Sequence, residues 1–178
     1  IKALNADIKK ENLVFINEVG LDPGIHHFFS HLLVSDLKKI STEKIEVIYE
    51  SYCGGFPAIP NDFKYKFSWS PAGVIKALNN YAKYITKGKI NTVTPYKSIN
   101  SYSISGENFE AYPNRDSTPY VSEYLFDEKW KVKEFVRGTL RLDGWKDAWQ
   151  DIFSMLENKS DNIEAEINEK SKELLKDN

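Results

Sequence analysis

The sequence has 178 residues, a length that suits one domain with a core of its own. Its formal net charge of -2 gives no electrostatic reason to expect binding to nucleic acid or to an anionic membrane. A single cysteine excludes an internal disulfide framework and fits a reducing compartment, and no apolar run reaches the roughly 20 residues of a membrane-spanning helix.

The first residues contain no apolar signal-peptide core, and the absence of an initial methionine leads us to expect a fragment or a processed product. Residues 1–11 are typical of the end of a helix. The run LVFIN at 13–17 is almost wholly apolar, which predicts a short strand buried on both faces.

Asp22 and Pro23 form a predicted helix start, because aspartate caps free N–H groups and proline suits the first helical position. Apolar residues then recur at helical spacing and predict one buried face, made of Ile25, Phe28, Phe29, Leu32, Leu33, Leu37 and Ile40.

Alternation from Ile45 onward predicts a strand that ends at Cys53, Gly54 and Gly55. Aromatic residues follow at every second position from Phe63 to Trp69 and predict an extended arm that packs on one face. Ser70 and Pro71 begin a second predicted helix that stops at Gly88, and its apolar face comprises Val74, Ile75, Leu78, Tyr81, Ala82 and Ile85.

The remaining chain is mostly short strands, predicted at 89–93, 98–105 and 108–112, and then a clear strand at 131–142. The last predicted helix buries Trp145, Ala148, Trp149, Ile152, Phe153 and Leu156. Because short loops join neighbouring strands, we expect an α+β fold with helices packed on one mixed, largely antiparallel sheet.

Cys53 lies where a strand meets two glycines, and glycines allow a ligand to approach the backbone closely. Most free cysteines are buried structural thiols, and no histidine adjoins this one to activate it. His27 and His31 lie one helical turn apart, a spacing that zinc sites use, but Cys53 is the only other soft ligand and we expect no metal.

Arg115 lies in the loop 114–119, where it is either solvated beside a turn formed by Asn114 and Asp116 or bound to a ligand carboxylate. Arg137 and Arg141 share one face of a strand and either pair with acidic residues or point into a site for an acidic ligand. No GxGxxG or GxxxxGK[ST] motif is present, so the chain encodes neither familiar nucleotide site.

Three stretches in order resemble the saccharopine dehydrogenase family (the L-glutamate-forming enzymes): NEVGLDPGIHH, SYCGGFPAIPNDFKYKFSWSP and AYPNRDSTPY…VRGTLRLDGW. The resemblance implies a C-terminal, substrate-binding and dimerisation domain of the glyceraldehyde-3-phosphate-dehydrogenase-like type at 22–157. It also implies that 1–21 end a Rossmann domain otherwise absent from this chain, and that 158–178 form a polar helical or disordered tail.

The family interconverts saccharopine with L-glutamate and 2-aminoadipate 6-semialdehyde in lysine metabolism, using NADP or NAD. The resemblance therefore implies hydride transfer from the carbon beside a secondary amine to nicotinamide, followed by hydrolysis of the imine. It places Asp22, Pro23 and Gly24 next to the cofactor, which the Rossmann domain would mainly hold. It makes Asp22 the first and Cys53 the second candidate for the general base, and assigns substrate binding to Cys53, Gly54, Gly55, Asn114 and Arg115.

The sequence departs from the family at His26, which replaces an aspartate, and in the shortened PAIPND loop. Two alternatives stay open: a non-catalytic dimerisation or amino-acid-binding module, and a related reductase such as carboxynorspermidine dehydrogenase. We expect a homodimer without nucleic-acid or membrane partners, located in the cytoplasm or, for a bifunctional lysine-degrading enzyme, in the mitochondrial matrix.

Overall fold

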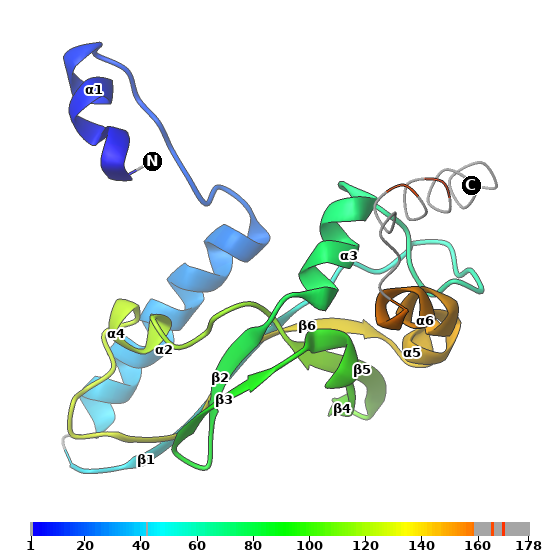
Figure 1. Cartoon of the computed structure of the whole chain (residues 1–178). Helices are drawn as coiled ribbons and strands as arrows, with labels where there is room; N and C mark the ends of the chain where they lie inside the picture. Colours follow the sequence, from blue (N-terminus) through cyan, green and yellow to red (C-terminus); the bar gives the residue numbers. More distant parts are fainter. Residues whose placement is uncertain (1, 42, 159–164, 166–168, 170–178) are drawn as a thin grey trace.

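The computed structural model describes residues 2–41, 43–158, 165 and 169 (Figure 1). The predicted polar tail at 158–178 thus lies almost wholly outside the described residues. Within the described part, no helix has both the length and the apolar character needed to cross a bilayer.

One six-stranded sheet organises the chain, and its central strand is the 12-residue β6 (Lys131–Leu142). The order is β3-β2-β6-β5-β4, with β1 (Glu46–Cys53) paired in parallel to β6. The other pairs are antiparallel and join β2 (Ala82–Thr86), β3 (Lys89–Val93), β4 (Asn100–Ile104) and β5 (Glu107–Pro113). The predicted mixed, largely antiparallel sheet is confirmed, as are the strands predicted near 46–53, 89–93, 98–105, 108–112 and 131–142.

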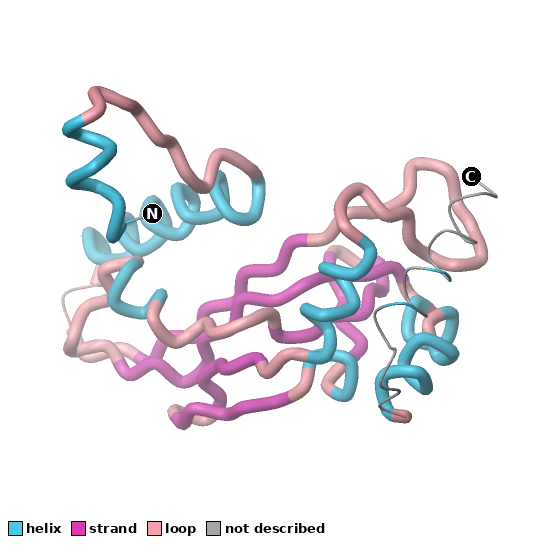
Figure 2. The backbone as a smooth tube through the Cα atoms, turned by 45° about the horizontal axis from the view of Figure 1, so that its top comes forward, coloured by secondary structure: helices cyan, strands magenta, loops and turns pink. Residues whose placement is uncertain are grey.

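Helices lie toward both ends of this sheet (Figures 1 and 2). One group packs around Val47, Tyr49 and Phe135 of β1 and β6 and consists of α2 (His26–Ile40) and α4 (Tyr120–Glu123). The other consists of α3 (Pro71–Asn79), α5 (Trp145–Ala148) and α6 (Gln150–Glu157), near the short turn η3 (Pro95–Lys97). The N-terminal η1 (Lys2–Leu4) and α1 (Asn5–Lys10) stand apart from both groups in Figure 1.

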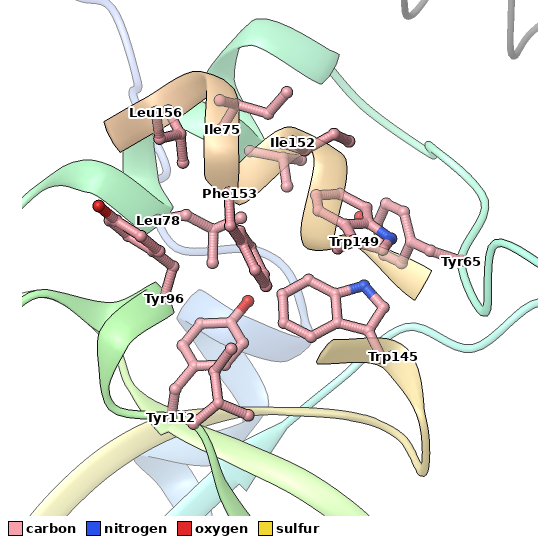
Figure 3. Packing of buried hydrophobic residues seen from close by; sticks show 12 residues of the cluster. Tyr65, Ile75, Leu78, Tyr96, Tyr112, Trp145, Trp149, Ile152, Phe153 and Leu156 are labelled. Carbon is pink, nitrogen blue, oxygen red and sulfur yellow. The ribbon is translucent and has the colours of Figure 1, made fainter. Parts of the chain in front are cut away.

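The aromatic cluster beneath α3 and α6 is the larger core (Figure 3). Trp145 and Trp149 are fully buried there, and their ring centroids lie 4.8 Å apart. The predicted C-terminal helix is confirmed in its buried face but is divided into α5 and α6 at Trp149. The predicted aromatic arm forms no strand, although Phe63, Tyr65 and Phe67 do pack against this cluster, whereas Trp69 is exposed.

The strand predicted at 13–17 is wrong. The segment has no regular secondary structure, and its side chains are exposed, with Val14 at 84%. Among the described residues no strand lies beside it, so its backbone has no ladder partner and its side chains have no cover.

The helix start predicted at Asp22 is also wrong. Asp22, Pro23 and Gly24 have non-helical backbone angles within the turn η2 (Leu21–Ile25), and α2 begins at His26 without a side-chain cap. A Cβ at Gly24, where φ is +146°, would lie 2.6 Å from the Glu18 carbonyl oxygen, so this tight turn requires glycine. Asp22 is therefore free to reach a partner in another part of the chain.

Helix α2 buries a different face from the one that its apolar spacing predicts. Ser30 and Val34 are buried, and the Ser30 hydroxyl lies 2.6 Å from the Tyr49 hydroxyl of β1. Phe28 and Leu33 of the predicted face are 75% and 66% exposed. This hydrogen bond and the packing of Val34 set the rotation of the helix, and the apolar face is left uncovered by the described residues.

The helix predicted from Ser70 to Gly88 begins as expected and ends early. The Ser70 hydroxyl accepts a hydrogen bond of 3.2 Å from the Gly73 amide, as an N-cap does. The helix stops at Asn79, and Ala82–Thr86 instead forms β2, so Tyr81, Ala82 and Ile85 do not belong to a helical face. Gly88, with φ +72°, lies in the turn between β2 and β3.

Candidate functional site

A cleft of about 480 Å³ opens between the η2 segment, α3 and one face of β6. Its lining includes three arginines and two carboxylates, Arg115, Arg137, Arg141, Glu18 and Asp22. The excess of positive charge suits an anionic ligand.

Strand β6 places Arg137 and Arg141 in the cleft together with Thr139. Alternate residues of a strand share a face, so the pattern R-G-T-L-R directs all three to one side. This shared face agrees with the side-chain alternation of the sequence, which is compatible both with pairing to acidic residues and with contact to a ligand. In the structure, Arg137 pairs with a carboxylate, whereas Arg141 forms no ion pair with a described carboxylate.

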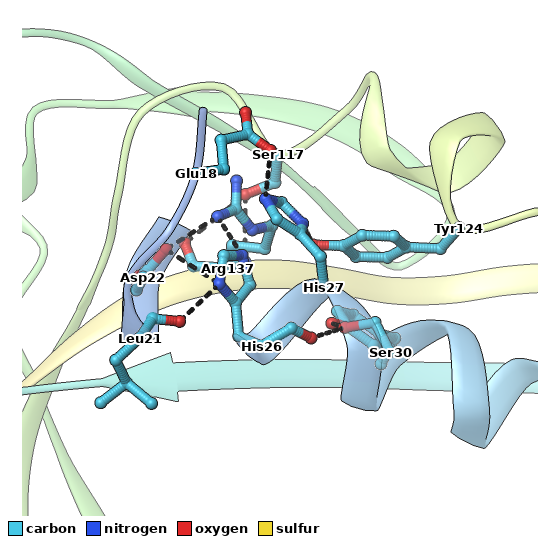
Figure 4. A network of polar contacts seen from close by, with 10 residues as sticks. Glu18, Leu21, Asp22, His26, His27, Ser30, Ser117, Tyr124 and Arg137 are labelled. Atoms are coloured by element: carbon cyan, nitrogen blue, oxygen red, sulfur yellow. Dashed lines mark hydrogen bonds and ion pairs between the residues drawn. The ribbon is translucent and has the colours of Figure 1, made fainter. Parts of the chain in front are cut away.

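Arg137 is paired within the protein (Figure 4). Its Nη2 donates a hydrogen bond of 3.0 Å to Asp22 Oδ1, and its Cζ lies 3.9 Å from the centroid of the Tyr120 ring. The two charged side chains are only 12% and 21% exposed. Asp22 therefore compensates the Arg137 charge instead of capping a helix.

His26 is a further hydrogen-bonding partner of the Arg137 guanidinium. Its Nε2 lies 2.7 Å from Arg137 Nη2, and its Nδ1 lies 3.0 Å from the Leu21 carbonyl oxygen. A guanidinium only donates and a carbonyl only accepts, so the contacts require neutral imidazole with the hydrogen on Nδ1. His26 thus orients a cleft arginine, a role that the sequence did not indicate.

His27 and His31 face Tyr124 rather than a shared ligand. His27 Nδ1 lies 2.8 Å from the Tyr124 hydroxyl, and the His31 ring packs edge-on against the Tyr124 ring. Burial lowers the pKa of His27, and the neighbouring Arg137 charge lowers it further. The described residues contain no group of three or more His, Cys, Asp or Glu side chains that could hold a metal ion.

The loop at 114–119 brings Asn114 and Arg115 to the cleft. Asp116 stabilises the loop by accepting hydrogen bonds of 2.9 and 2.6 Å from the Thr118 amide and hydroxyl. The Arg115 side chain is exposed, and its carbonyl accepts a hydrogen bond of 2.8 Å from the Lys83 amide. The Asp116 part of the turn interpretation is therefore correct, and it is compatible with Arg115 at the cleft.

Cys53 and Gly54 lie at a second hollow, beside Phe29, Phe56 and Leu140. Burial raises the pKa of the Cys53 thiol, and the Asp22 charge adds to this rise while the Arg141 charge opposes it. A Cβ on Gly54 would clash with the Leu140 carbonyl, so this glycine serves the packing of the chain on β6. Gly55 has open space around it and lines neither hollow.

Comparison with known proteins connects this geometry to a family. Residues 20–174 match the saccharopine dehydrogenase C-terminal domain. The chain is 37% identical over 162 residues to saccharopine dehydrogenase [NADP(+), L-glutamate-forming] of Saccharomyces cerevisiae, and 38% identical over 149 residues to the protein of the same name from Pyricularia oryzae. The chain belongs to the saccharopine dehydrogenase family.

The relatives extend beyond the part that this chain matches. The chain is 38% identical over 156 residues to the mitochondrial alpha-aminoadipic semialdehyde synthase of Rattus norvegicus. It also aligns with the structure of apo saccharopine dehydrogenase (L-Glu forming) from Saccharomyces cerevisiae, with a TM-score of 0.70 over 87% of this chain. The alignments cover 35% of the yeast sequence and 16% of the rat one, so the chain corresponds to part of these relatives.

Proposed function

We propose that this chain is the substrate-binding part of an NAD(P)-dependent saccharopine dehydrogenase. The observation that carries the proposal is the cleft that combines Arg115, Arg137 and Arg141 with Asn114. Saccharopine carries three carboxylates, and arginine is the side chain that pairs with a carboxylate through two parallel hydrogen bonds. The family relationship favours this ligand over other acidic molecules.

The nicotinamide nucleotide supplies the hydride acceptor when it is bound. The sequence has no GxGxxG turn, the motif that holds the pyrophosphate in dinucleotide-binding domains, and we assign that contact to residues outside this chain. We place Asp22 and Pro23 at the reacting end of the substrate, because both line the cleft.

For the general base, Asp22 remains the first candidate and Cys53 the second. Arg137 holds Oδ1 of Asp22, whereas Oδ2 has no hydrogen bond within the described part and is available to a substrate amine. Cys53 is less suited, because a raised thiol pKa disfavours the reactive thiolate.

The assembly and location belong to the same proposal. We propose a homodimer in the cytoplasm or in the mitochondrial matrix. The exposed apolar face of α2, which includes Phe28, Phe29, Leu32 and Leu33, supports association with another protein surface. Light scattering of the purified protein tests the dimer.

The decisive experiment is a spectrophotometric assay of the complete protein that contains this chain, with saccharopine and each nicotinamide. We expect saccharopine-dependent reduction of NADP or NAD, and loss of most of that rate in Asp22→Asn. A folded complete protein that reduces neither nucleotide with saccharopine would remove the proposed activity and favour a non-catalytic module.

A further inference from the structure

Asp22 and Arg137 are joined by a single hydrogen bond. The Arg137 Nη2 donates to Asp22 Oδ1 at 3.0 Å, and the described residues offer no partner to Asp22 Oδ2. An arginine and a carboxylate frequently pair through two parallel hydrogen bonds, and Nε is the donor that lies beside Nη2 on one edge of the guanidinium. Arg137 Nε is buried and has no acceptor in the described part of the chain. An unsatisfied buried donor is costly, so something in the structure holds this pair apart from the two-bonded geometry.

His26 is the competing acceptor (Figure 4). Its Nε2 lies 2.7 Å from Arg137 Nη2, which carries two hydrogens and therefore serves His26 with one and Asp22 with the other. The imidazole is itself held in place, because its side chain is only 9% exposed and its Nδ1 donates to the Leu21 carbonyl oxygen at 3.0 Å. His26 thus fixes one end of the guanidinium independently of Asp22.

The Tyr120 ring restrains the guanidinium from a second side. The Arg137 Cζ lies 3.9 Å from the centroid of this ring, and such a cation–π contact favours a cation that stays over the ring face. With Nη2 held by His26 and the group held over Tyr120, the guanidinium does not turn to present Nε to Asp22 Oδ2. Asp22 lines the cleft, so its second oxygen stays free there.

We propose that His26 is a positioning residue, whose neutral imidazole limits the pairing of Arg137 with Asp22 to one carboxylate oxygen and so leaves Oδ2 open to the substrate amine. A carboxylate bound at both oxygens is a weaker proton acceptor, since each charged hydrogen bond stabilises its ionised form. His26 acts through Asp22, because the described lining of the cleft does not include His26. The inference rests on the proposed function for the role of Asp22 as the base, whereas the pairing itself is measurable without turnover.

NMR of the whole 178-residue chain at neutral pH tests the pairing. The imidazole nitrogen shifts should place the hydrogen of His26 on Nδ1; a hydrogen on Nε2 would overturn the inference, because Nε2 could then accept nothing from Arg137. His26→Asn removes the Nε2 acceptor, so the Arg137 Nε–H resonance should move downfield as Asp22 Oδ2 reaches it. In His26→Gln, whose side-chain oxygen extends about as far as Nε2, this resonance should stay in place. The absence of a downfield shift in folded His26→Asn would also overturn the inference.

Kinetics of the complete protein with saccharopine separate positioning from substrate binding. His26→Asn should lower kcat at least about tenfold and change KM less than about threefold, because a positioned general base contributes to the chemical step. His26→Gln should recover most of the lost rate. His31→Asn is the matched control and should keep the full kcat, since His31 is exposed on the same helix and is not part of the cleft lining. An unchanged kcat in His26→Asn, or a larger change in KM than in kcat, would contradict the positioning role.

A variant that does not fold leaves the inference testable. His26→Leu replaces His26→Asn in that case, since leucine also offers no acceptor to Arg137, and the His26 tautomer is measured without any substitution. If the complete protein does not oxidise saccharopine while the tautomer and the Nε–H shift are as expected, only the proposed function is overturned.

Discussion

Arg137 and Asp22 are 115 positions apart in the sequence, and the Arg137 Nη2 donates a hydrogen bond of 3.0 Å to Asp22 Oδ1. The ion pair joins the η2 turn to the central strand, and the Asp22 carboxylate compensates the charge of one of the three cleft arginines. Arg141, four residues further along the same strand, has no such partner in the described part of the chain. One face of β6 therefore presents a compensated and an uncompensated cation to the same cleft.

Asp22→Asn should lower the free energy of unfolding by about 1–3 kcal/mol, because it leaves a largely buried guanidinium without its carboxylate. Urea denaturation followed by circular dichroism measures the change. Asp36→Asn is the control, since its ion pair with Lys39 is exposed and should contribute less than about 1 kcal/mol. Equal effects of the two substitutions would contradict the prediction.

Acidification should destabilise the fold through His27. Its folded-state pKa is lowered below 6.5, so the unfolded chain binds more protons as the pH falls through and below that value. Stability should consequently decrease as the pH is lowered from about 7 to about 5, and His27→Gln should reduce this dependence. Denaturation midpoints across the pH range measure it. His31→Gln, at an exposed position of the same helix, should keep the full pH dependence; a similar loss in both variants would refute the assignment.

The neighbouring glycines Gly54 and Gly55 should respond differently to alanine. A Cβ at Gly54 would clash with the Leu140 carbonyl, so Gly54→Ala should cost about 1–3 kcal/mol, as overpacking usually does. Nothing lies within 4 Å of a Cβ at Gly55, so Gly55→Ala should be neutral or slightly stabilising. Thermal denaturation of both variants tests this contrast. A stable Gly54→Ala protein would mean that the close approach of the chain to β6 can relax.

Cys53 should behave as an unreactive thiol. Because burial raises its pKa above the ordinary 9.0, alkylation by iodoacetamide at neutral pH should be slower than that of free glutathione. In the complete protein, Cys53→Ser should retain substantial turnover. Rapid alkylation, or a folded Cys53→Ser protein without turnover, would show that the thiol takes part in the reaction.

The local spacing of apolar and polar residues in the sequence alone determined several strands and the buried face of the last helices. The strands at 46–53, 89–93 and 131–142 and the buried face of the last helices follow from side-chain periodicity, which each segment carries by itself. The shared face of Arg137 and Arg141 follows for the same reason. The motifs DPG, YCGG and YPNRDS indicated the family without any coordinates.

Only the tertiary structure decided which groups meet. Apolar spacing in α2 predicted a buried face that is exposed, because the contact of Ser30 with Tyr49 sets the rotation of the helix. The apolar run at 13–17 reads as a strand, yet a strand needs a neighbour, and none lies beside it in the described chain. Arg137 and Arg141 look alike in sequence. Their charges differ in effect because only Arg137 meets a carboxylate, and that carboxylate comes from a turn far away in the chain.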